Sequence, residues 1–120
     1  GRVIAKGKDP DLRRLEIGDL VYGQCWKMGS FAEYAIVEAK NVHKMPSLLD
    51  PLNAASIPLV SQTSYQAIVK AKLKKGDKFL ILGGSTATGI MATQIAKKFI
   101  QCEKVIVTSS QEELCKSLGA

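Results

Sequence analysis

The sequence has few cysteines, and no two of them lie close together. Cys25, Cys102 and Cys115 are odd in number, widely separated and free of any C-x-x-C spacing. A disulfide framework and a zinc knuckle both need paired or closely spaced cysteines, so the pattern argues against either. We therefore expect a protein of a reducing compartment, and we assign it to the cytoplasm.

Long apolar runs are also missing. No segment approaches the roughly 20 apolar residues that cross a bilayer, and none has the form of a secretory leader. We expect a soluble chain with no membrane partner.

The charge is positive but not concentrated. The formal net charge is +6, and the lysines are scattered along the chain instead of forming one basic tract. Scattered lysines are typical of a solvated surface, so nucleic acid is a disfavoured partner. An anionic cofactor is compatible with this charge.

The 120 residues, 46% of them hydrophobic, suffice for a core in one domain or in parts of two. Up to about residue 46, the pattern predicts short strands between glycine turns, at residues 3–5, within "GDLVYG" (18–23) and over "FAEYAIV" (31–37). This indicates an antiparallel, barrel-like β region. Trp26, in the loop "QCWKMGS", is expected to pack against the protein and not to contact a ligand.

The segment after this region predicts helices. Asp50 followed by Pro51 is typical of an N-cap with proline at the first helical position. Pro58 is expected to interrupt that helix, and helical spacing resumes over residues 61–73 with apolar residues on one side. "KKGD" (74–77) is the turn expected to end it.

From Lys78 onward the pattern is strand, helix, strand, helix. "KFLILGG" (78–84) is a continuous apolar run, typical of a parallel strand covered on both faces. Residues 90–100 carry a helical apolar stripe, and "KVIVT" (104–108) predicts the second strand. Parallel strands joined by a crossover helix predict an α/β fold containing half of a doubly wound sheet.

The turn after the first of these strands is rich in small residues. The dinucleotide fingerprint places three glycines at a strand-to-helix turn, where the backbone approaches a pyrophosphate. Those places hold Gly84, Thr86 and Gly89. The Thr86 side chain either crowds the ligand, donates its hydroxyl to a phosphate oxygen, or only completes the turn. The context of strand, helix and second strand favours a dinucleotide site.

The end of the second strand bears on the choice of cofactor. An NAD site usually has a carboxylate there, about 20 residues after the turn, whereas this chain has Ser109 and Ser110. We therefore expect NADP(H), with Lys116 able to offset the nearby acidic residues if its side chain folds back. Ser110 also stands three residues before Glu113, so it predicts a capping box for the last helix.

Several stretches, in order, resemble one family. The chain is similar to the zinc-independent quinone oxidoreductase (zeta-crystallin-like) branch of the medium-chain dehydrogenase/reductase superfamily, in the stretches "GRVIAKGKD", "GDLVYG", "GSFAEYAIV", "AASIPLVSQTSYQAI", "LKKGDKFLILGGSTATGIMATQIAK" and "KSLGA". Chains of that superfamily are about three times as long. The resemblance therefore implies a central fragment, which we expect to be inactive in isolation.

The resemblance implies a specific architecture. It predicts the C-terminal part of a GroES-like β-barrel catalytic domain over residues 1–57, followed by a connecting helix over 58–76. Residues 77–120 would form the first βαβα half of a Rossmann doubly wound parallel sheet.

The resemblance also implies the cofactor contacts. Thr63 would lie near the nicotinamide, and Ser110 would meet the adenosine ribose or its 2′-phosphate. The phosphate turn would consist of Gly84, Ser85, Thr86, Ala87, Thr88 and Gly89. The "GGVG" usual in the family is "TATG" here, which puts the affinity in question but not the fold.

The resemblance implies that no metal is bound. Zinc-dependent alcohol dehydrogenases of the superfamily use a cysteine at the place of Leu59, and their structural zinc lobe has closely spaced cysteines where this chain has only Cys25. The single histidine, His43, has no partner at ligand spacing and is expected to be an ordinary residue.

The expected function is an NADPH-dependent, metal-free oxidoreductase that transfers hydride to a quinone or an electron-poor alkene or enone. The cofactor carries the hydride chemistry. No residue has the pattern of a catalytic acid or base, and Tyr65 is expected to belong to the core. The intact protein is expected to form a homodimer. The alternative is a degenerate, non-catalytic relative with a structural, nucleic-acid-binding or nucleotide-binding role.

Overall fold

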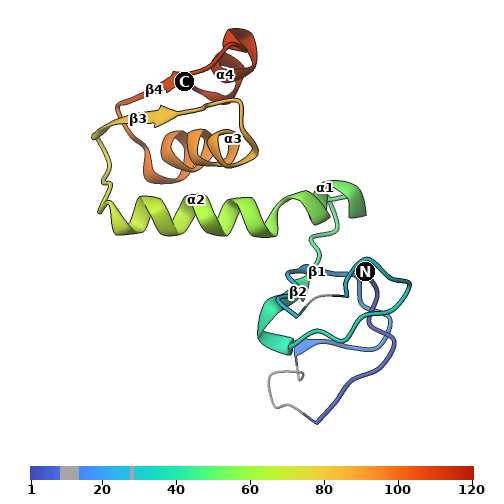
Figure 1. Ribbon diagram of the computed structural model, residues 1–120. Coiled ribbons are helices and arrows are strands. Elements are labelled where there is room, and N and C mark those ends of the chain that lie inside the picture. The colour runs from blue at the N-terminus through green and yellow to red at the C-terminus, as the bar shows by residue number, and fades with distance from the viewer. Residues whose placement is uncertain (9–13, 28) are drawn as a thin grey trace. The chain divides into compact units, whose positions relative to one another are not determined.

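The computed structural model describes residues 1–8, 14–27 and 29–120. It contains two compact units, Gly1–Leu59 and Val60–Ala120 (Figure 1). The division falls near the start of helix α2 (Pro58–Lys70), so most of the expected connecting helix belongs to the second unit. The domain limits expected after residues 57 and 76 remain a prediction.

The first unit contains one antiparallel pair of strands, β1 (Val21–Gly23) and β2 (Val42–Lys44). β1 lies in the glycine-bounded segment and confirms the strand expected there. The 3-10 turn η2 (Ala39–Asn41) leads into β2, which the sequence pattern did not predict. An isolated bridge between Arg2 and Leu20 extends the pairing next to β1.

Two of the expected strands do not form. Residues 3–5 contribute only backbone hydrogen bonds of Val3, and residues 31–37 pair with no described segment. Aromatic and branched residues favour a strand, but a ladder needs a second backbone to satisfy its N–H and C=O groups. Phe31 and Ile36 are fully exposed, at 107% and 97%. In the described chain, the barrel-like region therefore reduces to β1, β2 and the adjacent bridge.

The expected loop over residues 24–30 contains no helix or strand at its described positions, and Met28 lies outside the described residues. Trp26 is 67% exposed, so the expectation that it packs against the protein is wrong. The indole is amphipathic and tolerates an exposed position on a loop.

Helix α1 (Pro51–Ser56) begins where the sequence predicts. Asp50 is its N-cap, and Asp50 Oδ1 accepts hydrogen bonds from the backbone N–H groups of Leu52 at 2.9 Å and Asn53 at 3.1 Å. These bonds satisfy two donors that have no partner inside the helix. The N-cap prediction is therefore confirmed.

The second unit confirms the predicted order of strand, helix, strand and helix. Its elements after α2 are β3 (Lys78–Leu82), α3 (Ala87–Gln94), the π-helical segment η3 (Ile95–Ile100), β4 (Lys104–Thr108) and α4 (Glu112–Leu118). β3 and β4 are parallel neighbours, as a crossover helix between them requires. Figure 1 shows α3 between this pair of strands and α2.

The core of the second unit lies where η3 and the turn after it pack against the two strands. Ile81, Ala96, Cys102 and Val105 form a buried cluster there. Burial raises the pKa of the Cys102 thiol, and the nearby negative charge of Asp77 raises it further. Cys102 is therefore an apolar packing residue in its neutral form, and it forms no disulfide.

Two helix boundaries differ from the prediction. α2 begins at Pro58 and ends at Lys70, whereas the pattern predicts helix over residues 61–73. Proline lacks the N–H that the first turn of a helix leaves unpaired, so Pro58 starts the second helix as well as ending the first. The turn predicted over 74–77 is present, with Gly76 at φ +87°.

The predicted capping box at the last helix is wrong. α4 begins at Glu112 after Gln111, and no side chain caps it. Ser109 Oγ instead accepts a hydrogen bond from the backbone N–H of Gln111 at 2.9 Å, which forms a local turn before the helix. Short polar side chains favour such turns, and this one moves the helix start beyond Ser110.

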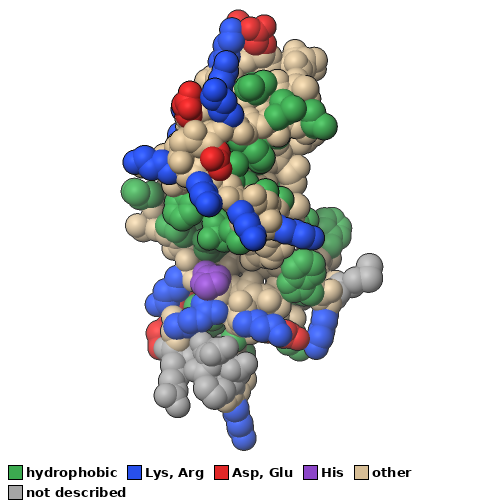
Figure 2. Space-filling model, turned by 90° about the vertical axis from the view of Figure 1, so that its left-hand side faces the viewer, with side chains coloured by type: hydrophobic (Ala, Val, Ile, Leu, Met, Phe, Trp, Pro, Cys, Tyr) green, Lys and Arg blue, Asp and Glu red, His purple; other side chains and the backbone are tan. Residues whose placement is uncertain are grey.

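Positive side chains are spread over the surface. Figure 2 shows lysine and arginine side chains at many places on the visible face, in agreement with the scattered pattern of the sequence. Large hydrophobic side chains are exposed as well, among them Leu48, Leu52 and Leu82. Tyr65 is 46% exposed, so the expectation that it belongs to the core is wrong. No helix of the described ranges has both the length and the apolar character that crossing a bilayer requires.

Replacing Asp50 by asparagine tests the cap. The hydrogen bond from the Asn53 backbone N–H, followed by the bond from Leu52, lowers the pKa of Asp50 below its usual value near 3.9 despite some opposing desolvation. Stability from this carboxylate is therefore present above about pH 4 and is lost as pH falls through the lowered pKa. We expect Asp50→Asn to keep the cap. Between pH 5 and 2, the urea unfolding midpoint of this variant should fall less than that of the parent protein.

The matched control is Glu33→Gln, which removes a carboxylate outside the cap. An unchanged acid-side slope in Asp50→Asn would contradict the assignment of Asp50 as a titrating cap.

Candidate functional site

The strand register places the predicted cofactor residues at one edge of the sheet. Leu82, the last residue of β3, pairs with Thr108, the last residue of β4. The carboxyl ends of both strands therefore lie side by side. The glycine turn follows the first strand, and Ser109 with Ser110 follows the second, so the structure brings these two predicted groups together. In open α/β sheets, ligands bind at this edge.

Thr108 joins the glycine turn to the end of β4. The N–H of Gly83 donates to Thr108 Oγ1 at 3.0 Å, and the N–H of Gly84 donates to the Thr108 carbonyl at 2.8 Å. Gly83 has φ +81°, a conformation that favours glycine. Sequence reasoning missed Thr108, although its place as the last residue of the predicted strand "KVIVT" marks it as the neighbour of this turn.

Gly84 and Gly89 are required by close packing. A Cβ built on Gly89 would lie 2.2 Å from the Gly83 carbonyl oxygen and 2.9 Å from Gly84 Cα. A Cβ on Gly84 would lie 2.6 Å from Val107 Cβ. Both glycines are buried. The first and last glycines of the fingerprint therefore let α3 approach the ends of the two strands.

Thr86 occupies the place of the middle glycine and is the N-cap of α3. Its Oγ1 accepts a hydrogen bond from the N–H of Gly89 at 3.1 Å and donates to the Gly83 carbonyl at 2.8 Å. The hydroxyl proton is thus used inside the turn. Of the three alternatives for Thr86, completion of the turn is the one that this geometry favours.

The first turn of α3 still offers backbone donors. Helix N-termini leave N–H groups without intrahelical partners. Thr86 takes the N–H of Gly89, while the amides of Ala87 and Thr88 have no acceptor among the residues that the structure describes. Thr86, Ala87 and Thr88 are exposed, and Ser85 is half-buried. An anion at this place would meet open N–H groups and the positive end of the helix dipole.

Helix α2 contacts the same turn through a residue that the sequence did not single out. Ser64 is buried, and its Oγ lies 2.8 Å from the carbonyl oxygens of Val60 and Thr88. Thr63, the residue predicted near the nicotinamide, precedes it in α2 and is exposed. A small polar residue beside a predicted cofactor residue is the signal that could have pointed to Ser64.

The predicted residues after β4 are all exposed. Ser109 bonds locally to Gln111, as described above, and Ser110 is free of any capping role. Lys116 Nζ forms an ion pair with Glu112 Oε1 at 2.6 Å, one turn earlier in α4. Lys116 therefore binds its helical neighbour in this structure, and an exposed pair of this kind exchanges readily with other anions.

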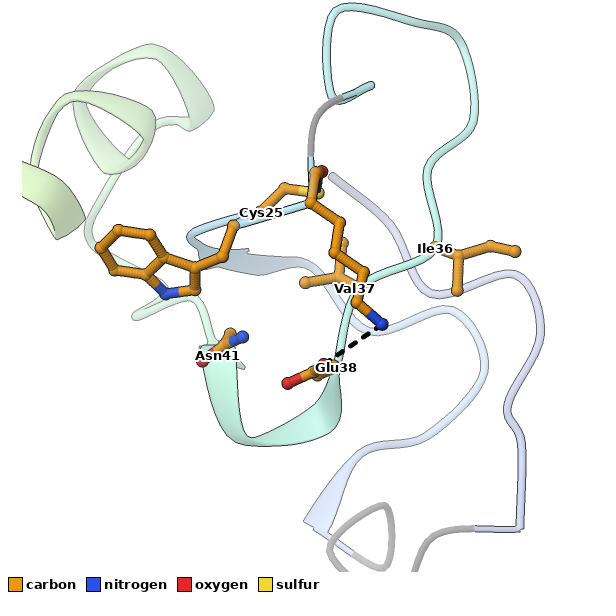
Figure 3. A pocket seen from close by; sticks show the side chains of 7 residues that line it. Cys25, Ile36, Val37, Glu38 and Asn41 are labelled. Atoms are coloured by element: carbon orange, nitrogen blue, oxygen red, sulfur yellow. Dashed lines mark hydrogen bonds and ion pairs between the residues drawn. The ribbon is translucent and has the colours of Figure 1, made fainter.

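The first unit contains pockets that the sequence did not predict. One cavity has a volume of about 150 Å³, and Trp26 is among the residues that line it. Figure 3 shows Cys25, Val37 and Glu38 around this cavity. Lys27 Nζ, also in its wall, pairs with Glu38 Oε1 at 3.5 Å. A second cavity, of about 440 Å³, is large enough for a small molecule. The wall of the second cavity includes the polar or charged residues Arg2, Gln24 and Glu33 beside apolar ones.

Metal ligands do not gather in residues 1–8, 14–27 and 29–120, where no three His, Cys, Asp or Glu side chains come together. His43 lies in β2, and its Nδ1 is 3.3 Å from Arg14 Nη1. An arginine next to the ring nitrogen disfavours a bound cation at that place.

Parallel strands with a glycine turn and an open helix N-terminus at their carboxyl edge form an α/β half-sheet, an arrangement at which many other proteins bind nucleotides. No protein-family model matches the chain. It is 39% identical to the 2-methylene-furan-3-one reductase of Solanum lycopersicum, over 100% of this chain and 33% of the relative. It is 34% identical to the chloroplastic NADPH-dependent alkenal/one oxidoreductase of Arabidopsis thaliana, over 91% and 31%.

Solved structures have the same fold over the whole of this chain. The quinone oxidoreductase from Coxiella burnetii matches with a TM-score of 0.87 and 34% identity, over 100% of this chain and 38% of that one. A putative zinc-dependent alcohol dehydrogenase protein from Rhizobium etli matches with a TM-score of 0.84 and 34% identity, over the same shares of the two chains. The chain is therefore similar to proteins named as quinone, enone and alkenal oxidoreductases, and it spans about one third of the length of its curated relatives.

Replacing Gly89 by alanine tests the close packing at the turn. The new methyl group would clash with the Gly83 carbonyl oxygen, which belongs to the backbone and cannot rotate away. We expect a loss of about 1–3 kcal/mol in the free energy of unfolding, measured by urea denaturation of the intact protein.

Thr88→Ala, at the exposed position one residue earlier, is the control and is expected to change stability by less than about 0.5 kcal/mol. Equal stability of Gly89→Ala and the parent would show that the helix does not need this close approach.

Proposed function

We propose that the intact protein is an NADPH-dependent, metal-free oxidoreductase that transfers hydride to a quinone or an electron-poor alkene or enone. Two kinds of observation support this. Three of the four proteins named above are, by name, a furanone reductase, an alkenal/one oxidoreductase and a quinone oxidoreductase, while the fourth is described as a putative zinc-dependent alcohol dehydrogenase. The structure of this chain has a glycine turn with open amides beside Ser109 and Ser110. The turn is the observation that carries the proposal, because it belongs to this chain itself.

The residues present fit a dinucleotide at this edge. The amides of Ala87 and Thr88, together with the turn from Gly84 to Gly89, would hold the pyrophosphate. Ser110, with Ser109 and Lys116 nearby in sequence, would meet the ribose 2′-phosphate, where a carboxylate would repel it. Thr63 would lie toward the nicotinamide. When bound, the cofactor supplies the hydride, while this chain binds and orients it.

Other features of the proposal follow from the family. With Leu59 at the place of a ligand cysteine, we place no catalytic zinc in this protein. The catalytic residues are unknown, because the described residues offer no acid or base beside the turn. A cytoplasmic homodimer completes the proposal, although the Arabidopsis relative is described as chloroplastic.

A second candidate function has an observation in its favour. The Thr86 hydroxyl occupies the Gly89 N–H, which a glycine at position 86 would leave open to a phosphate. A site that satisfies its own donors binds an anion less tightly. The protein would then be a non-catalytic relative with a structural, nucleic-acid-binding or nucleotide-binding role.

Titrating the intact protein with NADPH, followed by nicotinamide fluorescence, separates the two functions. The reductase requires micromolar binding and NADPH oxidation in the presence of an enone or a quinone. Binding at millimolar concentration or weaker, without turnover, would support the non-catalytic relative instead. Tighter binding of NADH than of NADPH would contradict the assignment of Ser109 and Ser110.

Replacing Thr86 by glycine tests the turn itself. The change removes a branched side chain and frees the N–H of Gly89 for a phosphate oxygen. We expect the NADPH Kd to fall by roughly threefold to tenfold, the effect of about one hydrogen bond.

Thr86→Ser is the matched control, since it keeps the capping hydroxyl and removes only a methyl group. Its Kd is expected to stay near that of the parent. Unchanged or weaker binding by Thr86→Gly would mean that Thr86 itself contacts the phosphate or lies outside the site.

A further inference from the structure

Ser64 carries a buried hydroxyl that the proposed function does not use. It is 4% exposed, and its Oγ lies 2.8 Å from two acceptors, the carbonyls of Val60 and Thr88, which share its single proton. A helical serine commonly bonds the carbonyl one turn earlier in its own helix, which here is Val60. The contact with Thr88 is different, because it joins α2 to the first turn of α3.

The contact with Thr88 begins a hydrogen-bond chain. The carbonyl of Thr88 and the N–H of Gly89 belong to one peptide unit, and that N–H donates to Thr86 Oγ1 at 3.1 Å. The Thr86 hydroxyl donates in turn to the Gly83 carbonyl at 2.8 Å. The chain thus leads from α2 through the N-terminus of α3 to the start of the glycine turn.

The chain continues to the second strand. The carbonyl of Gly83 and the N–H of Gly84 again belong to one peptide unit, and that N–H donates to the Thr108 carbonyl at 2.8 Å. Both peptide units, 83–84 and 88–89, are therefore held at the carbonyl and at the N–H. A peptide held at both ends cannot rotate without breaking a bond, and bonds in a chain polarise one another.

Resting on the proposed function, we propose that Ser64 is a positioning residue for the cofactor. By holding the Thr88 carbonyl, it fixes the direction of the backbone donors in the first turn of α3. Because Ser64 is buried, it would act through the Thr88–Gly89 peptide and not through a contact of its own with the cofactor. Preorganised donors bind an anion better than donors that must be ordered on binding.

The experiment measures the NADPH Kd of the intact protein and of two variants. Ser64→Ala removes the hydroxyl, and Ser64→Cys keeps nearly the same volume but donates only weakly. We expect both variants to raise the Kd by roughly threefold to tenfold, with a smaller change in KM for the enone acceptor. Parent-like binding by Ser64→Cys together with weak binding by Ser64→Ala would assign the effect to packing and overturn the proposal.

Thr93→Val is the matched control. Thr93 is also buried, and its Oγ1 donates to the Gly89 carbonyl at 2.9 Å, within α3 and outside the chain of bonds. We expect it to lower the unfolding midpoint about as much as Ser64→Ala while leaving the Kd unchanged. Equal increases of the Kd in Thr93→Val and Ser64→Ala would overturn the positioning role.

A double variant tests the link through the peptide unit. In Thr86→Gly the Gly89 N–H is free to meet the phosphate, so its direction matters more, and Ser64→Ala is expected to raise the Kd by a larger factor there than in the parent. Equal factors would overturn the link. A parent protein that binds no NADPH would refute the proposed function and this inference together, whereas binding that ignores Ser64 would refute the inference alone.

Discussion

The close approach of the α3 N-terminus to the end of β3 is the constraint on which the second unit depends. Gly89 lies so near the Gly83 carbonyl that even a methyl group would not fit. This approach brings the first turn of α3 against the carboxyl edge of the sheet, where Gly84 also binds Thr108. The same contacts that pack α3 against the sheet therefore also place its unpaired N–H groups at the carboxyl edge, where the candidate site lies.

Hydroxyl groups complete what the glycines allow. Glycine lets α3 approach the strands closely, but it has no side chain that could form a hydrogen bond in the turn. In this chain the hydroxyl groups of Thr86 and Thr108 form hydrogen bonds with the backbone of the turn. The same bonds have an opposing effect, because a turn that satisfies its own N–H groups offers fewer to a ligand. Thr86 therefore makes the turn more rigid but leaves it fewer N–H donors for a phosphate. Because these two effects on NADPH affinity oppose each other, a binding measurement is needed to separate the two candidate functions.

The second unit was predictable from the sequence because its signals are local. The apolar run of β3, the helical stripe and the run of β4 each fix an element, and parallel pairing follows from the crossover helix. The closeness of the turn to the end of β4, which defines the candidate site, then follows from the shared carboxyl edge. For Ser64 the sequence offered only its place beside Thr63, because the bond from Ser64 to the Thr88 carbonyl joins two helices and no spacing in the sequence encodes it.

The first unit was less predictable because its strands depend on distant partners. The segment at residues 31–37 has the composition of a strand, yet no described backbone pairs with it. Aromatic and branched residues favour a strand, but a strand is stable only where a neighbouring strand pairs with its backbone N–H and C=O groups. Relatives about three times as long contain more chain that could supply one. The exposed side chains of Phe31 and Ile36 are then consistent with a segment that needs a strand from outside the described residues as its partner. In the second unit, by contrast, β3 and β4 pair with each other.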